Sequence, residues 1–256
     1  MCKKIVIVSD LHCGSVFGLC PPAYYEADDA RRNMQKDAWQ AYSKITHQWH
    51  APDVLLVNGD CIEGTQKLQG GAELTTPDRN IQCEMAVKAL SLFRARKILI
   101  TYGSKYHTGE QAEDFEYNIA QDLGAEIGGR LFFELDGVVF DARHKVGSSS
   151  IPHGRATSLL KEMMWDLMKE ATESGPKVRV VVRSHVHYHI WIEQGDRVMF
   201  TTPALQLSRG RFGSRECVGE THWGAIRLTL SKGKIINKEV CLCGLSSNRP
   251  KLMRLG

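Results

Sequence analysis

The chain lacks the features that mark membrane-spanning and exported proteins. No run of apolar residues approaches the roughly 18 that a membrane-spanning helix needs, so we expect no membrane span and no membrane partner. The apolar run Ile5 to Val8, which follows two lysines, is too short for the core of a signal peptide. Export is therefore not expected.

The sequence also lacks a disulfide or zinc-finger pattern. Its eight cysteines are scattered along 256 residues without an export signal, which favours reduced thiols in a cytoplasmic protein. Cys241 and Cys243 have no second pair at zinc-finger spacing, and alternation along a strand explains their spacing better. We therefore expect a cytoplasmic protein.

No internal repeat, low-complexity tract or linker divides the chain, so we predict one domain spanning residues 1–256. Hydrophobic residues make up 43% and charged residues 24%, a profile typical of globular proteins. The net charge of +4 is compatible with a phosphate-bearing substrate and does not require nucleic acid.

Apolar patterning predicts an α/β fold. Strands are expected where short runs rich in Val and Ile occur, and helices where apolar residues recur at helical spacing. Helices come early and antiparallel strands late, which favours two sheets with helices outside over one doubly wound sheet. The expected helices cover about 27–49, 78–94, 110–123 and 155–173, and the expected strands 5–8, 53–58, 97–102, 131–134, 138–142, 178–183, 188–193, 197–202, 225–231 and 235–241.

Side chains able to bind a metal follow the predicted strands. Asp10 and His12 come directly after the first, where extended geometry would point both side chains to the same side. One such histidine is more often a surface or core residue, and Asp10 alone could cap a turn. That interpretation does not explain why so many of these groups lie at strand ends. The full set is Asp10, His12, Asp60, His107, His144, His185 and His187.

Two carboxylates and four or five imidazoles exceed the ligands of one catalytic zinc. The number fits two divalent cations that share a carboxylate. Oxygen and nitrogen ligands without thiolates select among Mn, Fe and Zn without singling one out. Glu63 could join the site or be solvated, and a solvated side chain is favoured. The other histidines are expected to be structural or peripheral, namely His47, His50, His153, His189 and His222.

The order of these residues resembles the calcineurin-like metallophosphoesterases, whose pattern is Asp-x-His, Gly-Asp, Gly-Asn-His, a lone His and Gly-His-x-His. The resemblance covers residues 10–187. It implies a four-layer α/β/β/α sandwich of two mixed sheets with a dimetal site at one edge. It also implies that Asp60 bridges the metals. Asp10, His12 and His187 would then complete one metal site, and His144 and His185 would belong to the other.

Two departures from the family pattern concern the site. Ser184 stands where the family usually has glycine, and the Gly-Asn-His turn is replaced by the longer segment 103–107. The missing asparagine leaves two roles for His107, as a metal ligand or as a group near the leaving oxygen with water or Ser104 in the vacant position. Some phage-type members carry a similar lengthened turn, which leaves a phage or mobile-element origin open.

These observations favour hydrolysis of a phosphodiester, a nucleic acid or nucleotide, by a metal-bridging hydroxide. Lys105, Arg209 and Arg211 are candidates for binding phosphate oxygens, although a solvated loop explains the arginines equally well. The alternatives are a phosphomonoesterase acting on a phosphoprotein or small metabolite, a metal-dependent amide hydrolase, and a non-catalytic scaffold of the same fold. The oligomeric state does not follow from the sequence.

Overall fold

The computed structural model describes residues 2–108, 114–149, 151–207 and 220–245. The helices are α1 (Asp29–Gln48), α2 (Arg79–Ser91), α3 (Lys105–Thr108), α4 (Phe115–Leu123) and α5 (Arg155–Ala171). The strands are β1 (Lys3–Val8), β2 (Val54–Val57), β3 (Lys97–Thr101), β4 (Glu126–Gly128), β5 (Leu131–Leu135), β6 (Val138–Lys145), β7 (Val180–Ser184), β8 (Ile190–Gln194), β9 (Arg197–Thr201), β10 (Gly224–Ser231) and β11 (Lys234–Leu242).

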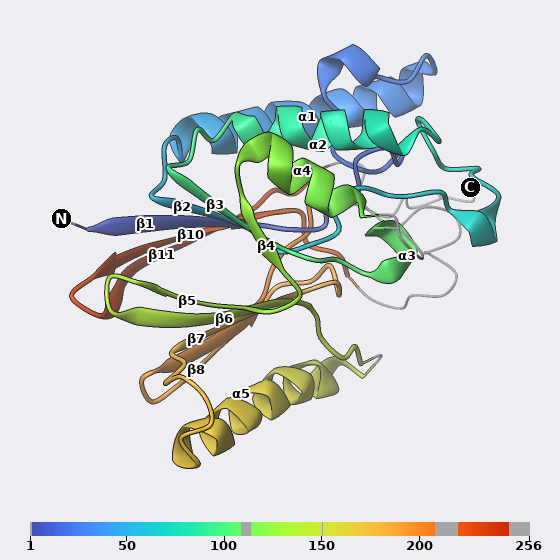
Figure 1. Cartoon of the computed structure of the whole chain (residues 1–256). Helices are drawn as coiled ribbons and strands as arrows, with labels where there is room; N and C mark the ends of the chain where they lie inside the picture. The colour runs from blue at the N-terminus through green and yellow to red at the C-terminus, as the bar shows by residue number, and fades with distance from the viewer. Residues whose placement is uncertain (1, 109–113, 150, 208–219, 246–256) are drawn as a thin grey trace, which may run out of the picture.

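The strands form two mixed sheets. The first has six strands in the order β11-β10-β1-β2-β3-β4, and the second has five in the order β5-β6-β7-β9-β8. Strands β1 to β4 run parallel to one another, as do β6, β7 and β9. Helices α1, α2 and α4 cover the first sheet and α5 lies beyond the second (Figure 1). The predicted α/β fold with two sheets and outer helices is confirmed.

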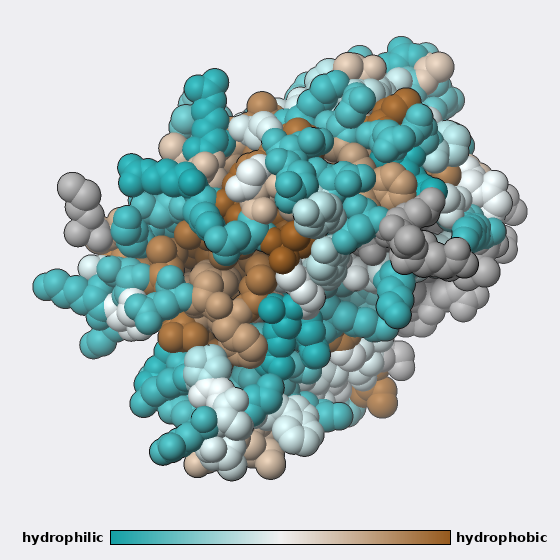
Figure 2. All heavy atoms as spheres, viewed as in Figure 1, coloured by the Kyte–Doolittle hydropathy of each residue, from teal (hydrophilic) through white to brown (hydrophobic). Residues whose placement is uncertain are grey.

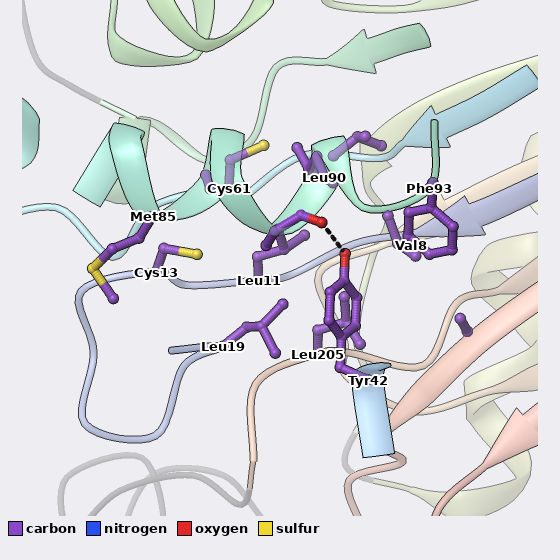
Figure 3. Packing of buried hydrophobic residues seen from close by; sticks show 14 of the residues in the cluster. Val8, Leu11, Cys13, Leu19, Tyr42, Cys61, Met85, Leu90, Phe93 and Leu205 are labelled. Atoms are coloured by element: carbon purple, nitrogen blue, oxygen red, sulfur yellow. Dashed lines mark hydrogen bonds between the residues drawn. The ribbon is translucent and has the colours of Figure 1, made fainter. Parts of the chain in front are cut away.

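Three apolar clusters fill the interfaces between these four layers. One packs α1, α2 and α4 on the first sheet, one lies between the sheets, and one packs α5 on the second sheet. Figure 3 shows the first cluster, in which the hydroxyl of Tyr42 on α1 donates to the carbonyl oxygen of Ala89 on α2 at 2.9 Å. This bond satisfies a polar group that packing would otherwise leave buried and unpaired.

Strand β1 lies in the interior of the first sheet, between β10 and β2. Ile5 and Ile7 belong to the cluster between the sheets, while Val6 and Val8 face the helices. The alternation of side chains along a strand places them on opposite faces, and both faces are covered. The prediction of a strand buried on both sides is therefore confirmed.

The two predicted turns are confirmed by the backbone. Asp136-Gly137 joins β5 to β6, and Lys232-Gly233 joins β10 to β11, with positive φ at all four residues. That pattern suits tight hairpins in twisted sheets. The short strand β4 was not predicted, because three residues are too few to show a periodic pattern.

The surface is mainly polar over α1, α2 and α4, whereas apolar atoms reach the surface between the layers (Figure 2). Helix α5 exposes Met164, Trp165 and Met168, and edge strand β5 exposes Phe132. In the described ranges, no helix is both long and apolar enough to cross a bilayer.

Candidate metal centre

A buried polar seam joins the two sheets at the carboxyl ends of their strands. It consists of Ser9, Asn58, Thr101, Ser184 and Thr202, all fully buried. The Thr202 hydroxyl lies 2.6 Å from the hydroxyls of both Ser9 and Ser184. The Asn58 amide donates to Ser184 at 2.6 Å and accepts from Thr101 at 2.9 Å. The seam therefore holds the strand ends of both sheets together directly below the candidate site.

The backbone turns sharply where the candidate ligands follow their strands. Asp10, His12, Asp60, His185 and His187 all have positive φ, between 46° and 76°. Non-glycine residues rarely adopt this conformation, and those that do are often found at functional sites. The expectation that Asp10 and His12 converge through extended geometry is thus wrong in its detail. Left-handed turns, rather than a continuing strand, bring the two side chains together.

The first group of side chains contains Asp10, His12 and His187. One ligand atom from each lies within 4.8 Å of the others. His187 Nε2 is 3.2 Å from Asp10 Oδ1, and His12 Nε2 is 3.9 Å from the same oxygen. Burial alone would raise the pKa of Asp10, but the charge and hydrogen bond of His187 hold that pKa well below its usual range.

The second group contains Asp60, His144 and His185, again within 4.8 Å. Asp60 Oδ2 lies 3.0 Å from His144 Nε2 and 4.0 Å from both His185 Nδ1 and His12 Nε2, so this oxygen lies between the groups. Burial would lower the pKa of His144, but the charge and hydrogen bond of Asp60 raise it to about 10. The amide and hydroxyl of Ser104 bond the Asp60 carboxylate at 2.7–3.2 Å.

Glu63 is buried against this centre, so the prediction of a solvated side chain is wrong. Its Oε2 lies 2.9 Å from His12 Nδ1, and its carboxylate also accepts from Gln66 and Gln206. Burial would raise the pKa of Glu63, but the hydrogen bond and charge of His12 lower it. The backbone turns after Asp60 and leaves no strand or helix period from which this contact could be inferred. A carboxylate behind a histidine commonly fixes the orientation of a metal ligand.

His107 lies beside the same groups, on the short helix α3. Its Nδ1 is 2.8 Å from the carbonyl oxygen of Glu63, and since a carbonyl only accepts, Nδ1 carries the proton. His107 also forms a close group with His12 and Asp60, within 4.8 Å. Burial would lower its pKa, but the charges of Asp60 and Glu63 raise it. The arrangement accommodates a ligand or a proton donor.

Glu116 on α4 is hydrogen-bonded to the two turns that carry this site. This role was not predicted from the sequence. It is fully buried and accepts from the backbone N–H groups of Cys61 at 3.0 Å and Gly103 at 2.6 Å. Burial and the nearby charge of Asp60 raise its pKa to about 7. An acid on the helix face that also carries Ile119 is a signal that could have identified it.

Two glycines permit the close approach of the ligands. A Cβ on Gly103 would lie 2.1 Å from Asp60 Oδ1, and a Cβ on Gly59 would lie 2.5 Å from the His144 ring. Gly59 also has a φ of +82°, which side chains rarely adopt. The glycine turns seen in the sequence are therefore needed for space at this centre.

Divalent cations fit this set of donors. Among the described residues, Asp10 and Asp60 have ion-pair partners that are all histidines, without lysine or arginine. Several buried atoms at the centre make close N···O contacts but no well-aligned hydrogen bond, a costly state unless another group binds them. They are Asp10 Oδ1, both ring nitrogens of His12, His144 Nε2 and His187 Nδ1.

The structure brings together the side chains of all seven predicted metal-site residues. The predicted substrate-binding residues lie differently. Lys105 is exposed on α3, two residues before His107. Arg209 and Arg211 fall outside the described residues. His222 accepts from the His189 amide and donates its own amide to the His187 carbonyl, consistent with the peripheral role expected of it.

No protein-family model matches the chain, and no curated protein matches it significantly. Solved structures are similar in fold. Vacuolar protein sorting 29 of Cryptosporidium parvum has a TM-score of 0.50 and 10% identity, over 94% of this chain and 97% of that one. An archaeal phosphodiesterase has a TM-score of 0.48 and 14% identity, over 94% of this chain and 100% of that one. YfcE, an Escherichia coli phosphoesterase, has a TM-score of 0.43 and 15% identity, over 93% of this chain and 98% of that one. With its four layers, two mixed sheets and strand-end turns, the chain has the calcineurin-like metallophosphoesterase fold.

Proposed function

We propose that the chain is a metal-dependent phosphoesterase that hydrolyses a phosphodiester, a nucleic acid or nucleotide. The observation that carries the proposal is the largely buried set of carboxylates and imidazoles, whose ligand atoms lie within 4.8 Å of one another in three groups that share His12 and Asp60. Bound metal cations would replace the protons of the facing histidines and offset the charge of these carboxylates, whose ion-pair partners among the described residues are histidines alone. The mildly basic net charge of +4 suits a polyanionic substrate.

We assign two divalent cations to the centre, each Mn, Fe or Zn. Asp10, His12 and His187 would hold one, His144 and His185 the other, and Asp60 would contribute to both. When bound, such cations acidify a water and offset charge on phosphate oxygens. Two cations, rather than one, are favoured because Asp60 Oδ2 lies close to histidines of both groups.

The chain's own residues orient these donors. The Asn58 carbonyl lies 2.7 Å from His144 Nδ1 and fixes the proton there, so His144 presents Nε2 to the centre. Glu63 Oε2 lies 2.9 Å from His12 Nδ1, and this contact would leave His12 Nε2 for a metal. Ser104 occupies the turn in which the family carries asparagine, and it bonds Asp60. We propose that it positions the shared carboxylate.

His107 takes one of two roles in this proposal, a further ligand or the donor of a proton to the leaving oxygen. Both use Nε2, since Nδ1 is bonded to the Glu63 carbonyl. The variant His107→Gln separates them. Loss of kcat with unchanged metal content indicates the proton donor, whereas loss of bound metal indicates the ligand. The exposed Lys105 is proposed to contact phosphate, so Lys105→Ala should raise KM with little effect on kcat.

The test is hydrolysis of bis(p-nitrophenyl) phosphate and p-nitrophenyl phosphate with added Mn²⁺, for the wild type and Asp60→Asn. We expect faster hydrolysis of the diester, and a loss of more than about 100-fold in the variant, because even outer partners of metal ligands affect activity 10–100-fold. Equal activity of the two proteins would rule out the metal mechanism. Preference for the monoester would favour a phosphomonoesterase, and metal binding without hydrolysis of either ester a scaffold.

A further inference from the structure

The end of edge strand β11 carries two thiols in contact. Cys241 belongs to the strand, Cys243 follows it, and their Sγ atoms are 3.6 Å apart. Residues two apart in a strand are separated by about 6.7 Å along it. The two sulfurs therefore lean toward each other instead of projecting in parallel.

These thiols differ from the other described cysteines in the access that solvent has to them. Cys13, Cys20, Cys61 and Cys83 are buried, whereas Cys241 and Cys243 are only partly covered. Thiol chemistry requires access to the attacking sulfur as well as its ionisation. Cys2 is exposed and provides a single-thiol control on the same chain.

We propose that Cys241 and Cys243 are a reversible redox pair, which closes to an intramolecular disulfide by exchange with a low-molecular-weight disulfide such as oxidised glutathione. The proposal is independent of the metal centre. It assigns a modification site to a pair of thiols that has no place in the phosphoesterase chemistry.

The exchange proceeds in two balanced steps. A thiolate of the pair attacks one sulfur of the disulfide, which forms a mixed disulfide and releases one thiolate that takes up a proton. The second thiolate of the pair then attacks the protein sulfur, which closes the ring and releases the second small thiol. The protein loses two protons and two electrons, and the small disulfide gains them. Burial and the neighbouring Cys241 raise the pKa of Cys243 to about 12, so we assign the first attack to Cys241.

The closed ring would be easily reduced. A disulfide needs an S–S separation of about 2.05 Å and a limited range of Cα distances, of which a two-residue strand spacing lies at the upper end. The backbone is also restrained there, because the Cys243 amide donates to the Trp223 carbonyl at 2.9 Å. A Cβ on Gly224 would lie 1.7 Å from the Cys241 carbonyl oxygen, so the neighbouring strand is in contact. Strained disulfides of this kind are the labile ones.

The experiment equilibrates the folded full-length chain in glutathione buffers of increasing oxidised fraction, followed by acid quenching, alkylation and tryptic mapping. The peptide 239–251 contains both thiols and no other cysteine. We expect it to lose two hydrogens and to regain them fully with a dithiol reductant. In Cys243→Ser, we expect glutathione to remain attached at Cys241 at least about tenfold more than in the wild type, since the resolving thiol is gone.

The control is Cys2→Ser, which should leave the mass shift of this peptide unchanged. The proposal is overturned if the peptide stays reduced while Cys2 is glutathionylated, or if it carries two glutathiones. A cross-link to another cysteine, including Cys217 outside the described residues, would also overturn it. Because none of these measurements involves metal or hydrolysis, failure of the phosphoesterase proposal would leave the outcome unaffected.

Discussion

The molecule contains two clusters of partly or fully buried charged side chains, and they differ in how their charges are satisfied. The candidate metal centre at the strand ends has carboxylates that face histidines. The second, here called the ionic cluster, ties α5 to the second sheet. Its members carry equal numbers of both signs and are Arg130, Arg143, Arg183, Asp141, Glu162 and Asp166.

Most charged groups of the ionic cluster are hydrogen-bonded to one another. Asp141 accepts from Arg130 at 2.7 and 2.8 Å and also bonds the fully buried Arg183. Arg183 donates to Glu162 on α5 at 2.7 Å and to the Asp141 carbonyl at 3.0 Å. Asp166 Oδ2 and Arg143 Nε lack a hydrogen-bond partner. The positive and negative charges nevertheless offset each other without an external ion.

Burial of charge does not by itself identify a functional site. Both clusters contain buried groups with shifted pKa values, and in the ionic cluster burial and the charge of Asp141 raise the pKa of Asp166 to about 6. Of the two, only the candidate metal centre combines carboxylates paired with histidines alone and several residues in the left-handed backbone region. Changes in the ionic cluster should therefore affect folding, and changes in the metal centre should affect metal binding.

The largest effect on stability is expected for Arg183→Met. The change leaves the buried Asp141 and the Glu162 carboxylate with fewer partners, and breaking a buried ion pair in this way costs about 3–5 kcal/mol. Urea unfolding of the variant measures the loss. The double variant Arg183→Met, Asp141→Leu should recover part of it. Folded Arg183→Met should bind metal as the wild type does. If this variant also loses bound metal, the two clusters do not have separate roles in stability and metal binding.

Glu116→Gln should change how stability depends on pH. The pKa of Glu116 is about 7 when folded and near 4.5 when unfolded. Its contribution to the free energy of unfolding is therefore fully present below pH 4.5 and is lost as the pH rises through 7. The loss amounts to about 3 kcal/mol. We expect the metal-free wild type to lose this stability relative to the variant between pH 4.5 and pH 8. If the difference in unfolding free energy between the wild type and Glu116→Gln is the same at pH 4.5 and pH 8, this explanation is wrong.

Glu63→Gln should weaken metal binding by about 10–100-fold, because it removes the charge that orients His12. Isothermal titration with Mn²⁺ measures the change. The matched control is Glu73→Gln, a partly buried glutamate whose amide donates to Gln66 and whose side chain is not part of the metal groups. Equal affinities for Glu63→Gln and this control would remove Glu63 from the centre.

The smallest effect is expected for Ser184→Ala, which removes one hydroxyl from the polar seam. Asn58 retains its bond to the Arg143 carbonyl, so the loss should be about 1–2 kcal/mol. Ser91→Ala, an exposed serine on α2, should stay within about 0.5 kcal/mol of the wild type. A Ser184 variant as stable as the Ser91 control would show that the seam contributes nothing measurable.

The sequence supported the layers and the grouping of ligands because both depend on local patterns. Strand β1 is a continuous apolar run, and Asp10 and Asp60 follow strands whose carboxyl ends share one edge. Contacts set by tertiary packing left no such pattern. Glu63 reaches His12 through a backbone turn, and Arg183 meets Glu162 only because α5 folds back on β7. Left-handed φ at Asp10 and His12 also has no reliable signature in non-glycine residues.

The central claim is that the strand-end centre holds two divalent cations. Its most direct test is the metal content of the folded chain after equilibrium dialysis against Mn²⁺ or Zn²⁺, measured for wild type, Asp60→Asn and Arg183→Met. We predict two ions per wild-type chain, two per folded Arg183→Met chain, and at most one per Asp60→Asn chain. A wild type that binds no metal, or an Asp60 variant that binds as much as the wild type, would contradict the account.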